Sequence, residues 1–310
     1  MLARFALSIL ALFASFSPGR LSAVEKDIFN YEAQRAAAPG TKRIVFIATR
    51  GTHGGRGNHE FLAGEIYLAR RINAVYPNAY AVVYTDDKWP TDLSNADAII
   101  VGLNHGGRAA MDPGIKAAAA RGAGLMAIHF GVEVNKGEQG DNYLDWMGGY
   151  FETFWSVNPW WEADIRELGN HPVARGVKPF KVRDEWYYHM RFPEGMKNVT
   201  PILTATPPDS TRGRDGANSP HGGNPEVQKH KGEPEHVMWV IERPDGGRGF
   251  GFTGGHFHKG WANDEQRKLI LNALLWIAKV EVPAGGVNCA VTPEQLLLNM
   301  DNKGQNKPRP

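Results

Sequence analysis

The chain has very little cysteine: its 310 residues include one, Cys289. A single thiol cannot form a disulfide within the chain, so a hydrophobic core must stabilise the fold, and the chain is long enough to bury one. Cys289 follows the last predicted helix in a polar segment, which is an unfavourable place for a cysteine nucleophile. We therefore expect no thiol chemistry.

The sequence also lacks an excess of charge of one sign. The formal net charge is +2, from 35 Lys and Arg against 33 Asp and Glu, and the charges are dispersed. Without a basic stripe, a nucleic-acid partner is not expected. Beyond residue 23 there is no apolar run long enough to span a bilayer, so we also expect no transmembrane segment.

The first 23 residues, MLARFALSILALFASFSPGRLSA, differ from the rest. They contain Arg4, an apolar run over residues 5–16 and small residues ending at Ala23. This is the layout of a secretory signal peptide, and the apolar run is too short to cross a membrane. We predict cleavage near Ala23 and export to the periplasm or the medium. A retained N-terminal anchor is the alternative.

The remaining chain suits one large domain, at residues 42–280, followed by a polar tail at 281–310. Short apolar runs predict strands that are buried on both faces, at residues 42–49, 79–85, 96–103 and 124–131. Helices are predicted between them, at residues 60–76 and 112–124, the second with Asp112 as cap and Pro113 in its first turn. Strands and helices that alternate at this spacing indicate an open α/β sheet.

The second half of the chain is less regular. Residues 132–181 are rich in aromatic side chains and show little periodicity, and residues 207–235 have the composition of a long irregular loop. Strands are predicted at 199–206, 236–242 and 247–254, the last two forming a hairpin around RPDGG. A final helix at 263–280 has Asn263 as its cap and Gln266 in place for a capping box.

Six of the eleven histidines are candidates for a site, and five of them lie at or just after the end of a predicted strand, with His258 two residues further out. In open α/β sheets, ligands bind beyond the carboxyl ends of the strands, where the following loops converge. We therefore expect a cluster of imidazoles although the residues are up to two hundred positions apart. The six are His53, His59, His105, His129, His256 and His258.

Imidazole chemistry leaves two uses open for such a cluster. Neutral imidazole is a good ligand for zinc and similar divalent ions, and three protein ligands leave a position for water or substrate. Without a metal, the same side chains could move protons near neutral pH. For any single histidine, an exposed loop position is the simpler explanation, but the coincidence with so many strand ends favours a site. No nucleotide cofactor is expected.

Carboxylates and aromatic residues complete the candidate set. Glu133 lies in a loop four residues after His129, and Asp184 and Glu185 lie among aromatics in RDEWYYHMRF, where burying them would require partners. A solvent-facing strand edge is the alternative for that pair. Aromatic faces and nearby amides suit sugar rings, although core packing explains several of them. The candidates for substrate binding are Trp155, Asn158, Tyr187 and Trp261, together with His53 and His105.

Several motifs in order resemble the ThuA-like (trehalose utilisation) family: NHEF, GLMAIHFGVEV, GGYFETFWSVNP, DEWYYHMRF, GRGFGFTGGHFHKGW and RKLILNALLWIA. The resemblance covers roughly residues 42–280. That family is similar in fold to class I glutamine amidotransferases. The resemblance implies a flavodoxin-like, mostly parallel sheet with helices on both faces, here with long aromatic-rich insertions.

In the amidotransferases, the turn after the fourth strand carries the nucleophilic cysteine. The matching segment here is AIHFG, so His129 holds the place of the nucleophile and Ala127 replaces the first glycine of the motif. Without a thiol at that position, the resemblance excludes release of ammonia from glutamine through a thioester.

The resemblance also carries over individual positions. Members share the positions of His59, His129, Glu133, Asp184, Glu185, Tyr187 and His256, whereas His53, His105 and His258 resemble a narrower exported subgroup. The family is associated with disaccharide use, often alongside sugar dehydrogenases that make 3-keto sugars, which implies a functional link to such enzymes.

The leading hypothesis is an exported enzyme that acts on glycosides or 3-keto glycosides. A divalent metal ion such as zinc would be held by His59, His129 and His256. The candidates for acid–base work are Glu133, Glu185, Asp184 and His258, in a lyase, hydrolase or isomerase reaction. A carbohydrate-binding module without catalysis and a scaffold for protein interactions are the alternatives.

Overall fold

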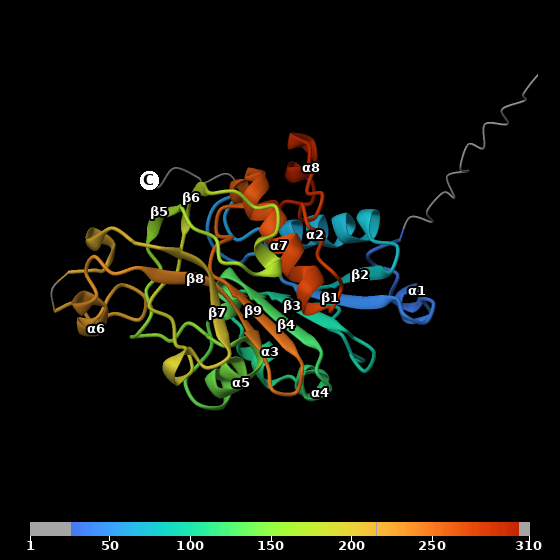
Figure 1. Ribbon diagram of the computed structural model, residues 1–310, viewed down its shortest axis with the longest axis horizontal. Helices are drawn as coiled ribbons and strands as arrows, with labels where there is room; N and C mark the ends of the chain where they lie inside the picture. The colour runs from blue at the N-terminus through green and yellow to red at the C-terminus, as the bar shows by residue number, and fades with distance from the viewer. Residues whose placement is uncertain (1–25, 215, 304–310) are drawn as a thin grey trace, which may run out of the picture.

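The computed structural model describes residues 26–214 and 216–303, so the expected signal peptide lies outside the described residues. The main sheet has seven strands in the order β2-β1-β3-β4-β9-β8-β7 (Figure 1). Neighbours from β2 to β9 run parallel, and β8 and β7 pair antiparallel at one edge. This confirms the predicted open, mostly parallel sheet. Its strands are β1 (Lys42–Ala48), β2 (Ala79–Tyr84), β3 (Ala98–Gly102), β4 (Gly124–Ile128), β7 (Val199–Ala205), β8 (Glu235–Glu242) and β9 (Arg248–Phe252).

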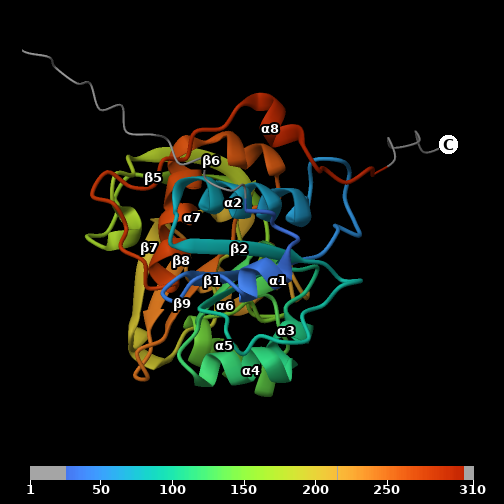
Figure 2. The same cartoon turned by 90° about the vertical axis from the view of Figure 1, so that its right-hand side faces the viewer.

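Helices cover both faces of this sheet (Figure 2). The apolar sides of α2 and α7 pack into one core, and those of α3, α4 and α5 pack into a second core on the opposite face. None of the helices within the described residues is long and apolar enough to cross a membrane. Their bounds are α1 (Tyr31–Arg35), α2 (Phe61–Val75), α3 (Gly107–Met111), α4 (Pro113–Ala120), α5 (Glu138–Met147), α6 (Pro225–Lys229), α7 (Asp264–Ile277) and α8 (Pro293–Leu297).

The predicted helix caps hold with one exception. The side chain of Asp112 accepts a hydrogen bond from the Ile115 amide at the start of α4. Asn263 accepts from the amides of Glu265 and Gln266 at the start of α7. The expected capping box is wrong, because the buried side-chain amide of Gln266 has no hydrogen-bond partner and does not return to Asn263.

The aromatic-rich region contains more regular structure than the sequence predicted. Besides α5, it forms a two-stranded antiparallel sheet of β5 (Trp160–Ile165) and β6 (Phe180–Glu185). Side chains of these strands alternate between buried and exposed, and their inner faces join the core that α7 covers. Packing therefore brings the end of β6 to the edge of the main sheet where the histidines lie.

Candidate metal centre

Four side chains converge beyond the carboxyl ends of the parallel strands: His59, His129, Glu185 and His256. Each offers one ligand atom, and these four atoms all lie within 4.8 Å of one another. The ring centroids are 4.2 Å apart for His59 and His256 and 5.3 Å apart for His59 and His129. The structure thus brings together the three predicted metal ligands, and it adds a carboxylate that the sequence had suggested for proton transfer.

The chain connectivity explains this convergence. His59 follows β1 at the start of α2, His129 is the first residue after β4, and His256 follows β9. Since β1, β4 and β9 are parallel, their following loops share one edge. The amide of His59 also donates to the carbonyl oxygen of His256, at 2.8 Å, and so ties two of the loops together.

His129 occupies a strained turn directly after β4. Its φ is 50°, in the left-handed region that residues with a Cβ rarely adopt. The Nδ1 atom lies 2.8 Å from the carbonyl oxygen of Thr253, so Nδ1 donates this hydrogen bond, and in a neutral ring the lone pair is on Nε2. That Nε2 faces the cluster, 3.3 Å from Glu185 Oε2 and 3.2 Å from the hydroxyl of Tyr187.

The ring of His256 is buried without a hydrogen bond. The residue is 4% exposed, and neither ring nitrogen has a hydrogen-bond partner. The Nδ1 atom lies 3.1 Å from Glu185 Oε2, within the distance of an ion pair. Buried polar atoms are normally paired, because an unpaired one costs about 1–3 kcal/mol. An ion coordinated by His256 would satisfy one of these nitrogens.

The electrostatics of the cluster favour the metal-binding forms of two of its members, His59 and Glu185. Burial, together with the neighbouring His129 and His256, lowers the pKa of His59 to about 2, so its imidazole stays neutral. Burial alone would raise the pKa of Glu185, but its contacts with His129 and His256 outweigh burial and hold that pKa well below its usual range. Neutral imidazole and ionised carboxylate are the states that bind metal ions.

A second layer of contacts holds these ligands in place. The indole Nε1 of Trp160 donates to Glu185 Oε1 at 3.1 Å. The fully buried carboxylate of Asp184 accepts from the amides of Gly255 and Phe257, at 2.8 and 3.1 Å, on either side of His256. Asp184 therefore connects β6 to the loop that carries His256 and positions that loop; the sequence had made Asp184 a candidate for acid–base work.

Glu133 lies beside the cluster and is paired with a histidine that the sequence had not singled out. Its Oε1 is 3.0 Å from Nε2 of His221, and this hydrogen bond raises the pKa of His221. The Glu133 side chain is buried, whereas the His221 side chain is 41% exposed to solvent. The charge of Glu185 also raises the pKa of His221, which places the pair near the cluster.

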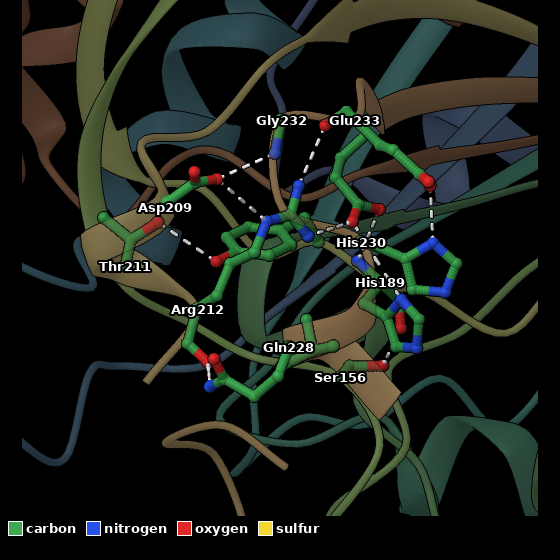
Figure 3. A network of polar contacts seen from close by, with 12 residues as sticks. Ser156, His189, Asp209, Thr211, Arg212, Gln228, His230, Gly232 and Glu233 are labelled. Atoms are coloured by element: carbon green, nitrogen blue, oxygen red, sulfur yellow. Dashed lines mark hydrogen bonds and ion pairs between the residues drawn. The ribbon is translucent and has the colours of Figure 1, made fainter. Parts of the chain in front are cut away.

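The long loop around His221 is anchored by a fully buried arginine, Arg212 (Figure 3). Its guanidinium pairs with Glu235 at 2.7 Å and donates to the carbonyl oxygen of Glu233 at 2.8 Å. Nearer the site, the amide of Asn158 donates to the carbonyl oxygen of His221 at 3.2 Å. These contacts hold the irregular segment 207–235 so that His221 reaches Glu133.

Other predicted site residues lie at different distances from the cluster. The centre of the His53 ring lies 4.0 Å from that of the His59 ring, with the two planes tilted by 40°, and Tyr187 contacts His129 directly. His105 lies further out, where its Nδ1 accepts from the Gly107 amide. His258 is turned away, with its Nε2 donating to the carbonyl oxygen of Leu296 at 2.6 Å.

Two tryptophans predicted to bind substrate, Trp155 and Trp261, are covered by other parts of the protein. Trp155 lies between the Arg191 guanidinium, 3.5 Å from its ring, and the His189 ring, 4.6 Å away. Trp261 is 4% exposed and lines a small cavity of about 10 Å³ beside the cluster, about the room that one water needs. Trp160 is 51% exposed and lies 5.6 Å from the His256 ring, so it is the better placed indole for stacking on a ligand.

Glu65 also lines this small cavity, and its burial leads to a prediction about stability. Its carboxyl is fully buried without a hydrogen-bond partner, and burial raises its pKa well above the usual value. Because the folded pKa exceeds the unfolded one, the contribution of Glu65 to stability is lost as pH rises from 4.5 towards the folded pKa, by about 1.4 kcal/mol per pH unit. Urea unfolding of Glu65→Gln should therefore show stability increasing relative to wild type from pH 5 to pH 8. A constant difference over that range would show that Glu65 does not titrate in this way.

The comparisons with known proteins agree with this fold. The profile of the ThuA family, described as trehalose utilisation, matches residues 57–277. This chain belongs to the ThuA family. The matched range includes all four residues of the His59, His129, Glu185 and His256 cluster. The match relates the protein to carbohydrate use at the level of its family.

One solved structure supports the ThuA fold. A ThuA-like protein from Bacteroides uniformis has 18% sequence identity and a TM-score of 0.52, with 77% of this chain and 92% of that chain covered. PurLQS from Thermotoga maritima is similar at 14% identity and a TM-score of 0.41, over 76% of this chain and 98% of that chain. No curated protein matches the chain.

Proposed function

We propose that this ThuA protein is an exported, metal-assisted enzyme that acts on glycosides, in particular 3-keto glycosides, by acid–base chemistry. The observation that carries the proposal is the set of three imidazoles and one carboxylate whose ligand atoms lie within 4.8 Å of one another. The family description, trehalose utilisation, supports a disaccharide or related glycoside as substrate. The sequence of residues 1–23 supports export.

The donor set fits a divalent ion such as zinc, which takes nitrogen and carboxylate ligands. His256 has buried ring nitrogens without a hydrogen-bond partner, and the lowered pKa of His59 keeps its imidazole in the neutral form that binds a metal ion. An ion held by His59, His129, His256 and Glu185 would polarise a carbonyl or hydroxyl group of the sugar.

The residues beside the cluster supply the proton transfers. Glu133 removes the proton from the carbon next to the keto group, the glycosidic C–O bond breaks, and the leaving oxygen takes a proton from His221. The exposed face of Trp160 stacks on the sugar ring. Water then adds to the carbon–carbon double bond of the eliminated sugar, so the overall reaction is hydrolysis; without that addition, it is a lyase reaction.

Turnover by protein stripped of metal and then reconstituted tests this proposal. The full chain is incubated with p-nitrophenyl 3-keto-glucoside and with trehalose, after EDTA treatment and after addition of zinc, manganese or magnesium. We expect release of nitrophenol only with metal present. Calorimetric binding of either sugar that does not depend on metal, with no product from any preparation, would instead indicate a carbohydrate-binding module.

Metal binding should also stabilise the fold. A ligand that binds only the folded state at 100 times its Kd adds about 2.7 kcal/mol to the free energy of unfolding. Thermal unfolding of EDTA-treated protein should therefore shift to higher temperature when zinc is added, and the shift should reverse with excess chelator. An unchanged transition at millimolar zinc would contradict a specific site.

A further inference from the structure

The segment after α7 is packed against the domain, although its composition suggested a polar tail. The carbonyl oxygen of Cys289 accepts from the Tyr67 hydroxyl at 3.1 Å and from Arg267 Nε at 3.0 Å. From there the chain passes through α8, which lies beside α2 (Figure 2). Residues 296–303, here called the C-terminal latch, then reach the loop at residues 50–60 that carries His53 and His59.

Asp301 is the centre of the latch. This residue is 5% exposed, and its carboxylate pairs with Arg50 at 2.6 Å and accepts from the Gly51 amide at 3.0 Å. Its own amide donates to Glu60 Oε2 at 2.6 Å. The other oxygen of Glu60 accepts from the Gly57 amide at 2.8 Å, so the two carboxylates fasten the loop at three points.

Lys303 adds a contact between the latch and His59 itself. Its Nζ donates to the carbonyl oxygens of Asn58 and His59, and lies 3.8 Å from Glu60 Oε1. A Cβ on Gly51 would come within 2.2 Å of the His59 carbonyl oxygen and 2.5 Å of Lys303 Nζ, so the backbones approach too closely for any other residue there.

His258 belongs to the same arrangement. Its Nε2 donates to the Leu296 carbonyl oxygen at the start of the latch, and its amide donates to the Gly57 carbonyl oxygen at 2.8 Å. The two histidines of the HFH motif therefore have different partners: His256 faces the metal cluster, and His258 joins the latch to the loop.

The loop at residues 50–60 would be costly to order without such contacts. It contains four glycines, which lose more conformational freedom than other residues on folding. His59 itself has a φ of 52°, in the left-handed region. Residues that orient a metal ligand through its neighbours typically change metal affinity about 10–100-fold when removed.

We propose that Asp301 and Lys303 are positioning residues for metal binding: the C-terminal latch holds the 50–60 loop so that His59 reaches His129, Glu185 and His256 before any ion arrives. This inference rests on the proposed metal site, but the order of the loop can be measured without a metal. Residues 296–303, which follow the domain in the sequence, thereby help to build the site at the carboxyl ends of its strands.

The double variant Asp301→Ala/Lys303→Met tests the latch in the full chain, with Glu294→Ala/Lys197→Met as a control of the same charge change at exposed positions. Two quantities are measured: hydrogen exchange at the amides of Gly51, Gly57 and His59 in metal-free protein, and zinc affinity by competition with a chelating dye. We expect exchange at these amides to become at least about tenfold faster, and the zinc Kd to rise about 10–100-fold. The control should match wild type in both.

Unchanged exchange, or faster exchange with unchanged zinc affinity, would overturn the positioning role. If the double variant does not fold, the conservative Asp301→Asn is measured in the same two ways, with the same criteria. Wild-type protein that binds no zinc would contradict the metal site itself, and the exchange data would then show separately whether the latch orders the loop.

Discussion

Replacing His129 with alanine should weaken divalent-metal binding by about 10²–10³-fold and abolish metal-dependent turnover. The magnitude follows because one of four ligands is lost from a site whose binding free energy is about 10–16 kcal/mol for structural zinc. His129 is fully buried, and its Nε2 is the ring nitrogen that faces Glu185 and Tyr187. The loss of its bond to the Thr253 carbonyl should cost only about 1–3 kcal/mol of stability.

The matched control for this prediction is His171→Ala. His171 is a partly buried histidine whose ring packs on Trp276, away from the cluster. Metal content by elemental analysis, zinc affinity by calorimetry and thermal unfolding should be determined for both variants. Full zinc affinity in folded His129→Ala protein would rule out His129 as a ligand.

Replacing Glu133 with glutamine should reduce turnover about 10²–10⁴-fold while leaving metal affinity unchanged. The reduction is the usual contribution of a positioned general base, and glutamine keeps the shape and a hydrogen bond to His221 but cannot accept the proton. Metal affinity should not change, because Glu133 is not among the four clustered residues. The initial rate on a 3-keto glycoside and the zinc Kd separate the two effects.

A second ion pair in the same loop offers the control. His230 and Glu233 lie 2.6 Å apart, and both are exposed. Glu233→Gln should therefore retain full activity, whereas His221→Asn should lose activity as Glu133→Gln does. Turnover of Glu133→Gln within about twofold of wild type would remove Glu133 from the mechanism.

Much of the fold could be predicted from local patterns. The buried parallel strands are continuous apolar runs, and the caps at Asp112 and Asn263 lie directly before periodic apolar residues. Such signals are local in the sequence. The side chain of Gln266 shows their limit: its spacing suits a capping box, but the folded helix buries it in another direction.

The convergence of His59, His129 and His256 could also be predicted, because parallel topology alone brings these strand ends together. The place of Glu185 could not, since it depends on how the separate β5–β6 sheet packs against the loop after β9 through Asp184. The alternating pattern of FKVRDE is the signal that could have revealed β6.

The roles of His221 and His258 depend on contacts between distant segments. His221 lies in an irregular loop that Arg212 anchors from within the protein, and no periodicity marks it. His258 has the spacing of a ligand, but the Leu296 carbonyl, 38 residues away, takes its Nε2. A motif read by spacing alone cannot distinguish these two outcomes.

The most direct measurement is elemental analysis of the full chain, expressed and purified without chelator. Our interpretation of the His59, His129, Glu185 and His256 cluster predicts close to one equivalent of a divalent metal per chain, and a loss of most of it in His129→Ala. Folded wild-type protein that carries no metal, and that remains empty after dialysis against zinc, would contradict it.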